Sequence, residues 1–459
     1  MRLYISMTDI VIKFGGTSVR KNPKNIVDIV CNKLKQNKRI ILVLSALSNI
    51  TNLLHKLYET NKLYDKLRLL RKISQIHKLF LERYHLKKKV YILRDLNFLY
   101  DKLLDIILSN VNSKYLRTII ITFGEKFSVT IYKHIFDECN ILNLVIWSEL
   151  LITTNNYKDN SFPLLDKSRD SVNKILGSKK YKQLIITTGY VARDVNGNKT
   201  NLGRNGSDFT ATILASVMNI ENVEIYTDVD GILTGDPMKI KNTKLIKRIN
   251  YKQISEMCYF GAKVLHPKTL IPLKNKSINV FIKNTFNPNN SGTLITEYYK
   301  STNILDAITS IDDSSLLTIK GHGMLGVSGI AYKLFKTLVK YNISTSFITQ
   351  ASSEQTICIS INNDIVGFVY ENLLDSFSEE LELGQIENID LKFDIAIITV
   401  IGTNMINKVG IAGKIFTVLG DNNINIIAIS QGTSEISISF VVKYDDEIKA
   451  LEVLHNEFL

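Results

Sequence analysis

Ile10-Val11-Ile12-Lys13-Phe14-Gly15-Gly16-Thr17-Ser18-Val19 is the stretch that decides how the N-terminal part of the chain folds. Its first three residues are β-branched and apolar, which is typical of a buried strand. Glycine adopts the backbone dihedrals that a sharp turn requires, and two glycines without side chains let main-chain N–H groups approach an anion. Lys13 adds a positive charge, and Thr17 and Ser18 add hydroxyl donors at the expected start of a helix. The stretch therefore predicts a phosphate-binding turn, although the Walker motif G-x-x-x-x-G-K-[ST] is absent from the sequence.

Composition narrows the class of protein. A chain of 459 residues holds two to four domains at about 100–200 residues per domain. No apolar run approaches the roughly 20 residues of a membrane span, and the first seven residues are too short and too polar for a signal peptide. We therefore expect a cytoplasmic protein without a membrane partner.

Cysteine spacing and charge exclude two further classes. The four cysteines lie far apart without a C-x-x-C pair, so we predict neither a disulfide scaffold nor a metal site held by the protein. The net charge of +13 raises the question of a nucleic-acid partner. The lysines are scattered and are not interleaved with aromatic residues, so we expect no nucleic-acid partner.

Strand-like and helix-like runs alternate from Ile10 to about Thr296, which predicts an α/β domain layered on a mostly parallel sheet. Residues 52–112 lack proline and glycine and place Leu63, Leu67, Leu70 and Ile73 on one helix face, so we expect a helical insertion there. The apolar run Ile119–Ile121 has the length of a strand.

The C-terminal part contains an internal repeat of a β-α-β-β type. Its first copy has strand-like runs at 316–319, 344–349 and 356–361 and a helix-like run at 331–341; the second has strand-like runs at 395–401, 424–429 and 436–442 and a helix-like run at 412–421. Ile348-Thr349-Gln350 aligns with Ile429-Ser430-Gln431.

The sequence contains two more polar clusters. Leu202-Gly203-Arg204-Asn205-Gly206-Ser207-Asp208 opens a helix, and its arginine can hold a carboxylate through two hydrogen bonds. A capped helix alone would explain the serine and the aspartate but not an arginine between two glycines. Thr227–Pro237 follows the strand Val223–Tyr226, a place where open α/β sheets bind ligands, although a solvated acidic turn is the simpler interpretation of this cluster alone. Ser45 and Glu125 are expected in similar positions at strand ends.

Taken together, these motifs resemble the aspartokinase family over nearly the whole chain. The matching segments are Lys13–Val19, Val43–Ala46, Gly124–Lys126, Leu202–Asp208, Thr227–Pro237 and Phe260–Pro267. The resemblance implies an amino-acid-kinase-type α/β/α sandwich in residues 1–300, followed by two ferredoxin-like βαββαβ ACT domains at 312–390 and 393–459. The greatest likeness is to the aspartokinase half of bifunctional aspartokinase–homoserine dehydrogenases. Whether a dehydrogenase half follows Leu459 is open.

The resemblance also implies roles for individual residues, with ATP and Mg²⁺ as cofactors and L-aspartate as substrate. Lys13 and Asp208 would act in phosphoryl transfer. Nucleotide contacts are expected from Lys13, Phe14, Gly15, Gly16, Thr227, Asp228, Leu233, Met238, Lys263 and Val264. Substrate contacts are expected from Ser45, Thr51, Glu125, Arg204, Asn205, Gly206 and Ser207, with Glu125 on the ammonium and Arg204 on a carboxylate.

Two positions depart from the family pattern. Tyrosine is usual where this chain has Leu233, and arginine is usual where it has Met238. Both positions normally touch the nucleotide, so weaker ATP binding is expected unless Lys239 replaces the missing charge.

The resemblance further implies feedback inhibition by an amino acid. Gln350 and Gln431 stand where threonine-inhibited relatives contact their effector, so we expect threonine rather than lysine as the feedback amino acid. ACT domains commonly pair across chains, so a homodimer or larger homo-oligomer is expected.

Three other interpretations of the sequence compete with an active aspartokinase. The run Gly321–Gly326 fits the dinucleotide pattern G-x-G-x-x-G, but no Asp or Glu lies between Gly326 and Glu354 to hold a ribose, so we interpret it as a turn. A decayed kinase that only binds regulatory amino acids stays open. A kinase for glutamate, acetylglutamate or a nucleotide is disfavoured by the combination of the first motif with the repeat.

Overall fold

The computed structural model describes residues 8–36, 38–84, 86, 89–109, 115–157, 159–177, 183–321, 329–350 and 355–459. The expected turn Gly321–Gly326 lies, apart from its first glycine, outside these residues. The chain divides into two compact units, the first formed by Met1–Ile232 with Leu265–Tyr298 and the second by Leu233–Val264 with Tyr299–Leu459. None of the described helices is long and apolar enough to cross a membrane.

The first unit is a three-layer α/β/α sandwich, as expected. Its strands are β1 (Thr8–Phe14), β2 (Lys38–Leu44), β3 (Asn143–Val145), β4 (Thr153–Thr154), β5 (Leu184–Thr188), β6 (Val191–Asp194), β7 (Lys199–Asn201), β8 (Asn222–Thr227), β10 (Asn279–Asn284) and β11 (Thr293–Thr296). Its helices are α1 (Gly16–Lys21), α2 (Pro23–Lys35), α3 (Ile50–Glu59), α4 (Leu63–Arg83), α5 (Lys89–Leu108), α6 (Leu116–Ile121), α7 (Phe123–Glu138), α8 (Ser148–Leu151), α9 (Leu165–Leu176), α10 (Gly206–Met218) and the 3₁₀ helix η1 (Pro267–Leu273).

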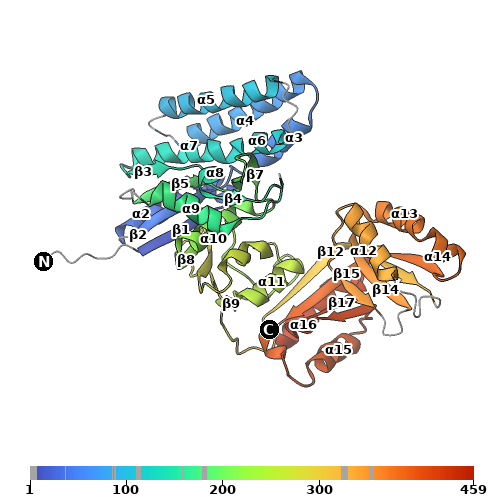
Figure 1. Ribbon diagram of the computed structural model, residues 1–459. Coiled ribbons are helices and arrows are strands. Elements are labelled where there is room, and N and C mark those ends of the chain that lie inside the picture. The colour runs from blue at the N-terminus through green and yellow to red at the C-terminus, as the bar shows by residue number, and fades with distance from the viewer. Residues whose placement is uncertain are drawn as a thin grey trace. The chain divides into compact units, whose positions relative to one another are not determined.

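The main sheet of this unit runs in the order β3-β5-β2-β1-β8-β10-β11. Strand β1 is central and pairs in parallel with β2 and β8, so the carboxyl ends of these three strands lie together. Ile10, Ile12 and Phe14 point into a core that also contains residues of α2, α3 and α7, whereas α10 packs against the opposite face of β1 and α9 packs on α10. The expected helical insertion is confirmed as α3, α4 and α5, and Figure 1 shows α4 and α5 lying beyond α7 on one side of the sheet.

One local expectation was wrong. The run Ile119–Ile121 is the end of helix α6 rather than a strand, and Glu125 therefore lies in the first turn of α7 instead of at a strand end. Ile120 and Ile121 are buried in the same core as Phe123 and Phe127. Burial of these side chains between helices outweighs the weak preference of isoleucine for strands.

The second unit is built on an antiparallel sheet in the order β13-β14-β12-β15-β17-β16. Its elements are β9 (Arg248–Asn250), α11 (Tyr251–Tyr259), β12 (Ala307–Lys320), α12 (Ile330–Lys340), β13 (Ile348–Gln350), β14 (Thr356–Asn362), α13 (Val366–Ser376), α14 (Ser378–Glu382), β15 (Asn388–Ile401), the 3₁₀ helix η3 (Thr403–Met405), α15 (Ile411–Asp421), β16 (Ala428–Gln431), β17 (Ser437–Lys443), the 3₁₀ helix η4 (Tyr444–Asp446) and α16 (Glu447–Phe458). The predicted repeat is confirmed, with α12 and α15 as equivalent helices.

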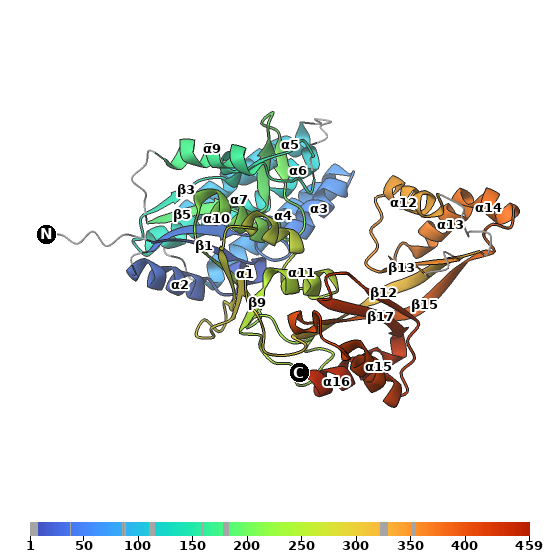
Figure 2. The same ribbon diagram turned by 60° about the horizontal axis from the view of Figure 1, so that its bottom comes forward.

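The two repeats share their two longest strands. Strand β12 pairs with β15 from Ala307 opposite Ile401 to Lys320 opposite Asn388. Helices α12, α13 and α14 gather at one end of this pair of strands and α15 and α16 at the other (Figure 2). The proposed ACT boundaries at 312, 390 and 393 fall inside these two strands, and they stay proposals.

Candidate functional site

The predicted phosphate-binding turn follows the central strand of the first unit. Lys13 is buried at the end of β1, and its Nζ lies 2.5 Å from Oδ1 of Asp208 in the first turn of α10. Both charges are almost fully removed from water, which makes their attraction strong. The two residues that we expected to act in phosphoryl transfer therefore lie together.

Close backbone packing fixes the shape of this turn. The Gly15 N–H donates to the carbonyl of Tyr226, and the Ser48 N–H donates to the carbonyl of Gly16. A Cβ atom on Gly16 would lie 2.7 Å from the carbonyl oxygen of Ala46, well inside van der Waals contact. Glycine at position 16 is therefore required by the close approach of the loop that follows β2.

Glu125 is a buried carboxyl group with spare bonding capacity. Only 4% of its surface is exposed, and its Oε1 accepts the Ala46 N–H at 3.4 Å. Oε2 has no hydrogen-bond partner among the described residues. Burial raises the pKa of Glu125 to about 8, and backbone hydrogen bonds offset this only in part. Such a group suits a cationic ligand that enters the site.

The remaining substrate-side candidates lie in the loop after β2, in α3 and at the start of α10. Ser207 packs against the turn after β5, where a Cβ on Gly189 would lie 2.3 Å from its Oγ. Asn205 has a left-handed backbone with φ of 54° and donates to Asp208 Oδ2 at 3.4 Å. Arg204 is exposed, and no ion pair joins it to a described residue. Ser45 is half-buried after β2, Thr51 is half-buried in the first turn of α3, and Gly206 begins α10.

The predicted nucleotide contacts divide between the two units. Phe14, Thr227 and Asp228 belong to the first unit, with Thr227 at the end of β8 beside β1. Leu233, Met238, Lys263 and Val264 belong to the second unit. Met238 is 91% exposed.

Lys239 is not free to replace an arginine at the nucleotide. Its Nζ donates to Asp312 Oδ2 and Glu447 Oε1, both at 2.7 Å, and to Ser310 Oγ at 3.1 Å. Burial alone would lower the pKa of Lys239, but the hydrogen bonds to the two carboxylates outweigh burial and raise it. Lys239 thus ties the segment after Met238 to β12 and α16.

Replacing Lys239 by methionine is expected to destabilise the protein by about 1–3 kcal/mol, because the buried Glu447 carboxylate loses its cation. The melting temperature should fall by about 2–4 °C for each kcal/mol, measured by scanning calorimetry. Lys241→Met, at an exposed lysine two residues further on, is the control. Equal melting temperatures for both variants would contradict the structural role of Lys239.

The two glutamines of the repeat occupy equivalent positions. Gln350 ends β13 and Gln431 ends β16, the two edge strands of the six-stranded sheet. Thr349 Oγ1 donates to the Ile429 carbonyl at 2.9 Å, and Ser430 Oγ donates to the Ile348 carbonyl at 3.0 Å. This reciprocal pair of bonds brings the two Ile-(Thr/Ser)-Gln segments side by side.

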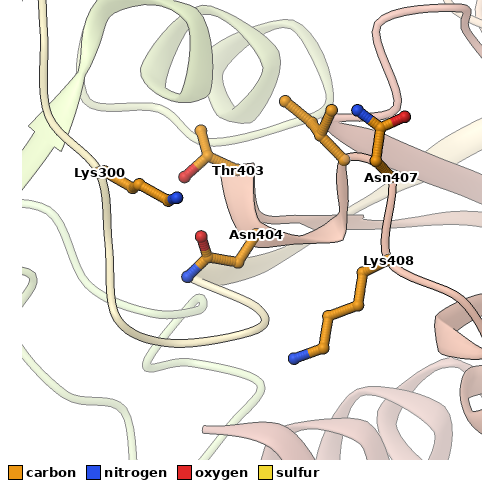
Figure 3. A pocket seen from close by; sticks show the side chains of 6 residues that line it. Lys300, Thr403, Asn404, Asn407 and Lys408 are labelled. Carbon is orange, nitrogen blue, oxygen red and sulfur yellow. The ribbon is translucent and has the colours of Figure 1, made fainter.

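A cavity of about 550 Å³ lies in the second unit, around the turn after β15. Figure 3 shows Lys300, Thr403, Asn404, Asn407 and Lys408 around it, and Ile406 completes its lining. The six lining residues include no carboxylate that could hold an amino-acid ammonium. None of the predicted site residues lies there.

Sequence reasoning missed the network that supports the Arg204 turn. Asn201 Oδ1 accepts the Gly203 N–H at 3.0 Å, and Lys268 Nζ donates to the carbonyl of Leu202 at 2.6 Å. Tyr190, after β5, has a left-handed backbone with φ of 67° and packs on Gly206. A strand followed by Thr188-Gly189 was a signal that could have found the Tyr190 turn. No sequence signal marks bonds to backbone carbonyls.

Comparison with known proteins assigns the class. Residues 9–284 match the amino acid kinase family, and residues 317–377 and 398–458 match the ACT domain. The chain thus belongs to the class of amino acid kinases that carry ACT domains.

Individual relatives show which family of amino acid kinases the chain resembles. The bifunctional aspartokinase/homoserine dehydrogenase of Buchnera aphidicola subsp. Acyrthosiphon pisum (strain APS) is 34% identical over 97% of this chain and 56% of that protein. Lysine-sensitive aspartokinase 3 of Escherichia coli (strain K12) is 30% identical over 98% of this chain and 99% of that protein. The crystal structure of E. coli aspartokinase III with aspartate and ADP has a TM-score of 0.81 at 28% identity, covering 97% of this chain and 99% of that chain. The chain belongs to the aspartokinase family.

The chain spans about half the length of the bifunctional relatives that it matches.

Proposed function

We propose that this protein transfers the γ-phosphoryl group of ATP to the β-carboxylate of L-aspartate, giving 4-phospho-L-aspartate and ADP. The observation that carries this proposal is the buried Lys13–Asp208 pair at the glycine turn. A carboxylate oxygen of aspartate attacks the γ-phosphorus, and the bond from that phosphorus to the β,γ-bridging oxygen breaks. The attacking carboxylate is already a nucleophile, so no strong base is needed, and positioning with charge neutralisation supplies the catalysis.

Each group of the site has a task in this reaction. Lys13 and the N–H group of Gly16 neutralise the transferring phosphoryl group, whereas the Gly15 N–H is bonded to the carbonyl of Tyr226 and Gly15 only shapes the turn. Glu125 Oε2 accepts a hydrogen bond from the ammonium of aspartate, and Arg204 donates two hydrogen bonds to a carboxylate of the same substrate. Thr227, Asp228, Leu233, Met238, Lys263 and Val264 contact the nucleotide, with weaker contacts at Leu233 and Met238 than the usual tyrosine and arginine would give.

Magnesium fits this site as a companion of the nucleotide. It prefers oxygen ligands and keeps several waters while it binds substrate phosphates. The Asp208 carboxylate beside the glycine turn is the group of this chain that would contact it. When bound, Mg²⁺ neutralises charge on the phosphates.

The test is aspartyl hydroxamate formation with ATP, magnesium, aspartate and hydroxylamine. Product that requires both aspartate and ATP supports the proposal, and glutamate in place of aspartate should give little product. Absence of product from folded protein that still binds threonine would favour the decayed-kinase alternative.

We further propose that threonine is the feedback inhibitor, acting at Gln350 and Gln431. The two equivalent glutamines support threonine, whereas the full-length match to a lysine-sensitive aspartokinase favours lysine as the second candidate. The reaction product would then feed synthesis of lysine, threonine and methionine. We also propose a homodimer or larger homo-oligomer, which light scattering after gel filtration would measure.

Gln350→Ala and Gln431→Ala should each raise the threonine concentration for half-inhibition by about 5-fold or more, since each removes hydrogen bonds of about 1 kcal/mol. Inhibition is measured in the hydroxamate assay relative to each variant's own uninhibited rate. Asn372→Ala, in which an amide bonded to its own helix α13 is removed, is the control. Inhibition by lysine but not threonine in the unaltered protein would overturn the threonine proposal.

A further inference from the structure

Lys268 contacts the turn that carries Arg204, although 66 residues separate it from Leu202. Its Nζ donates to the carbonyl of Leu202 at 2.6 Å and to Oδ1 of Asn160 at 2.5 Å. A Cβ on Gly203, which has a φ of 72°, would lie 3.0 Å from the same Nζ. The ammonium group is therefore packed directly against the backbone that leads into Arg204.

Among the described residues, no carboxylate forms an ion pair with Lys268, and both of its hydrogen-bond acceptors are neutral oxygens. Burial lowers its pKa. The Nζ of Lys268 also lies 5.8 Å from the centre of the ring of Phe209, which is in the first turn of α10. A cation at the positive end of a helix is electrostatically unfavourable, so this arrangement stabilises the folded chain less than the same bonds would elsewhere.

Lys276 shows the favourable arrangement at the other end of the same helix. Its Nζ donates to the carbonyl of Ser216 in the last turn of α10 at 2.6 Å. Burial lowers the pKa of Lys276 as it does for Lys268. There the cation meets the negative end of the helix, which is stabilising. The two lysines thus lie near opposite ends of one helix: Lys276 bonds to its last turn, and Lys268 bonds to the carbonyl of Leu202, four residues before the helix begins.

His266 bonds to the backbone of Lys268 and lies within electrostatic reach of Arg204. Its Nδ1 accepts the Lys268 N–H at 3.2 Å, so this nitrogen carries no proton. Burial lowers the pKa of His266, and the positive charges of Lys268 and Arg204 lower it further. The imidazole therefore adds no charge, and the two cations are left for an anion.

We propose that Lys268 is a positioning residue for the acidic amino acid substrate, which it serves by fixing the Leu202–Gly206 turn and by adding a second positive charge beside Arg204. A substrate with two carboxylates and one ammonium is a net anion, and it supplies the negative charge that Lys268 lacks. This inference rests on the proposed function.

The test compares the unaltered protein with Lys268→Met, Lys268→Arg and Lys276→Met. Lys268→Met should raise KM for aspartate about 5–20-fold, the range expected for one hydrogen bond to a charged group. KM for ATP and kcat should change less than about 2-fold on the same scale. Lys268→Arg should restore KM to within about 3-fold, since arginine keeps the charge and the donors. KM of Lys268→Met should also depend less on salt, because screening acts on one charge fewer.

Lys276→Met should leave KM for aspartate unchanged and lower the melting temperature more than Lys268→Met does. Equal rises of both KM values in Lys268→Met, a fall in kcat alone, or the same KM change in Lys276→Met would overturn the inference. Calorimetric titration of aspartate into the same proteins separates the two proposals. Unaltered protein that binds aspartate without forming product would refute the kinase activity, while the Kd of Lys268→Met, expected to be 5–20-fold weaker, would still decide the role of Lys268.

Discussion

Lys13→Ala is expected to lower kcat for hydroxamate formation by about 10²–10³-fold or more, comparable to the loss of one donor that stabilises a transition state. The reason is that the ammonium of Lys13 is fixed at the end of β1, where charge develops on the transferring phosphoryl group. Aspartate KM should change far less, since we propose that Glu125 and Arg204 bind the substrate ammonium and carboxylate. Steady-state kinetics with varied aspartate and ATP measure both quantities.

Loss of folding must be separated from loss of chemistry in this variant. Lys13→Ala leaves the Asp208 carboxylate buried without its cation, which is strongly destabilising. The double variant Lys13→Met/Asp208→Asn removes both charges and should recover most of the melting temperature without recovering kcat. Lys21→Ala, at the exposed end of α1, is the control on the same segment. An unchanged kcat in Lys13→Ala would rule out its role in transfer.

Glu125→Gln is expected to raise KM for aspartate by about 10²-fold, equivalent to about 2.7 kcal/mol for a buried hydrogen bond between charged groups. The amide keeps the size of the side chain but cannot neutralise the substrate ammonium. Turnover at saturating aspartate should fall much less. Ser128, whose hydroxyl donates to the Glu125 carbonyl at 2.9 Å, offers a control in Ser128→Ala, which leaves the carboxylate in place.

The pH dependence of aspartate binding follows from the same residue. Because the pKa of Glu125 in the free protein is raised to about 8, its carboxyl is mostly protonated at pH 7 and must lose a proton to accept an ammonium. Aspartate KM should therefore fall as pH rises toward 8 and level off above it, with up to about a tenfold change per pH unit below 8. In Glu125→Gln this pH dependence should vanish. A KM that is flat from pH 6 to 8 in the unaltered protein would contradict the assignment.

Raising the pH should lower the stability of the folded protein, although it strengthens aspartate binding. A carboxyl whose folded-state pKa exceeds its unfolded value binds its proton more tightly when folded, so the free energy of unfolding falls as pH rises between the two values. For Glu125 this window runs from the ordinary value of 4.5 to about 8. Glu125→Gln should consequently be more stable than the unaltered protein at pH 8.5, and the difference should shrink at pH 5.

Much of the fold could be predicted from the sequence because local pattern and tertiary packing agree. The stretch Ile10–Phe14 is apolar on both faces apart from Lys13, as a central parallel strand must be. The repeat was predictable because equivalent apolar positions recur in both copies. The run Ile119–Ile121 was misjudged because three isoleucines fit a strand or a buried helix equally well, and only the packing of α6 decides between them.

The site was predictable where residues follow each other in the chain and not where distant segments meet. The expected positions of Lys13, Ser45 and Thr227 at or next to strand ends are confirmed, and their roles stay proposals. The place of residues 233–264 in the second unit depends on bonds such as Lys239 to Glu447, which lie 208 residues apart. Likewise, Lys268 acts on a backbone carbonyl, and a carbonyl is present at every residue, so the sequence carries no mark of that bond.

The sharing of β12 and β15 by both repeats limits how this protein can be divided and recombined. The first five residues of β12 pair with the end of β15, whereas the end of β12 pairs with its beginning. A fragment that begins at residue 312 would lack Ala307–Ile311. The end of β15 in the last repeat would then lose its partner on that side, and its unpaired edge would be open to self-association. Neither repeat can therefore be excised, duplicated or exchanged by itself, so recombination between relatives should preserve the segment from 307 to the end of α16 as one inherited block.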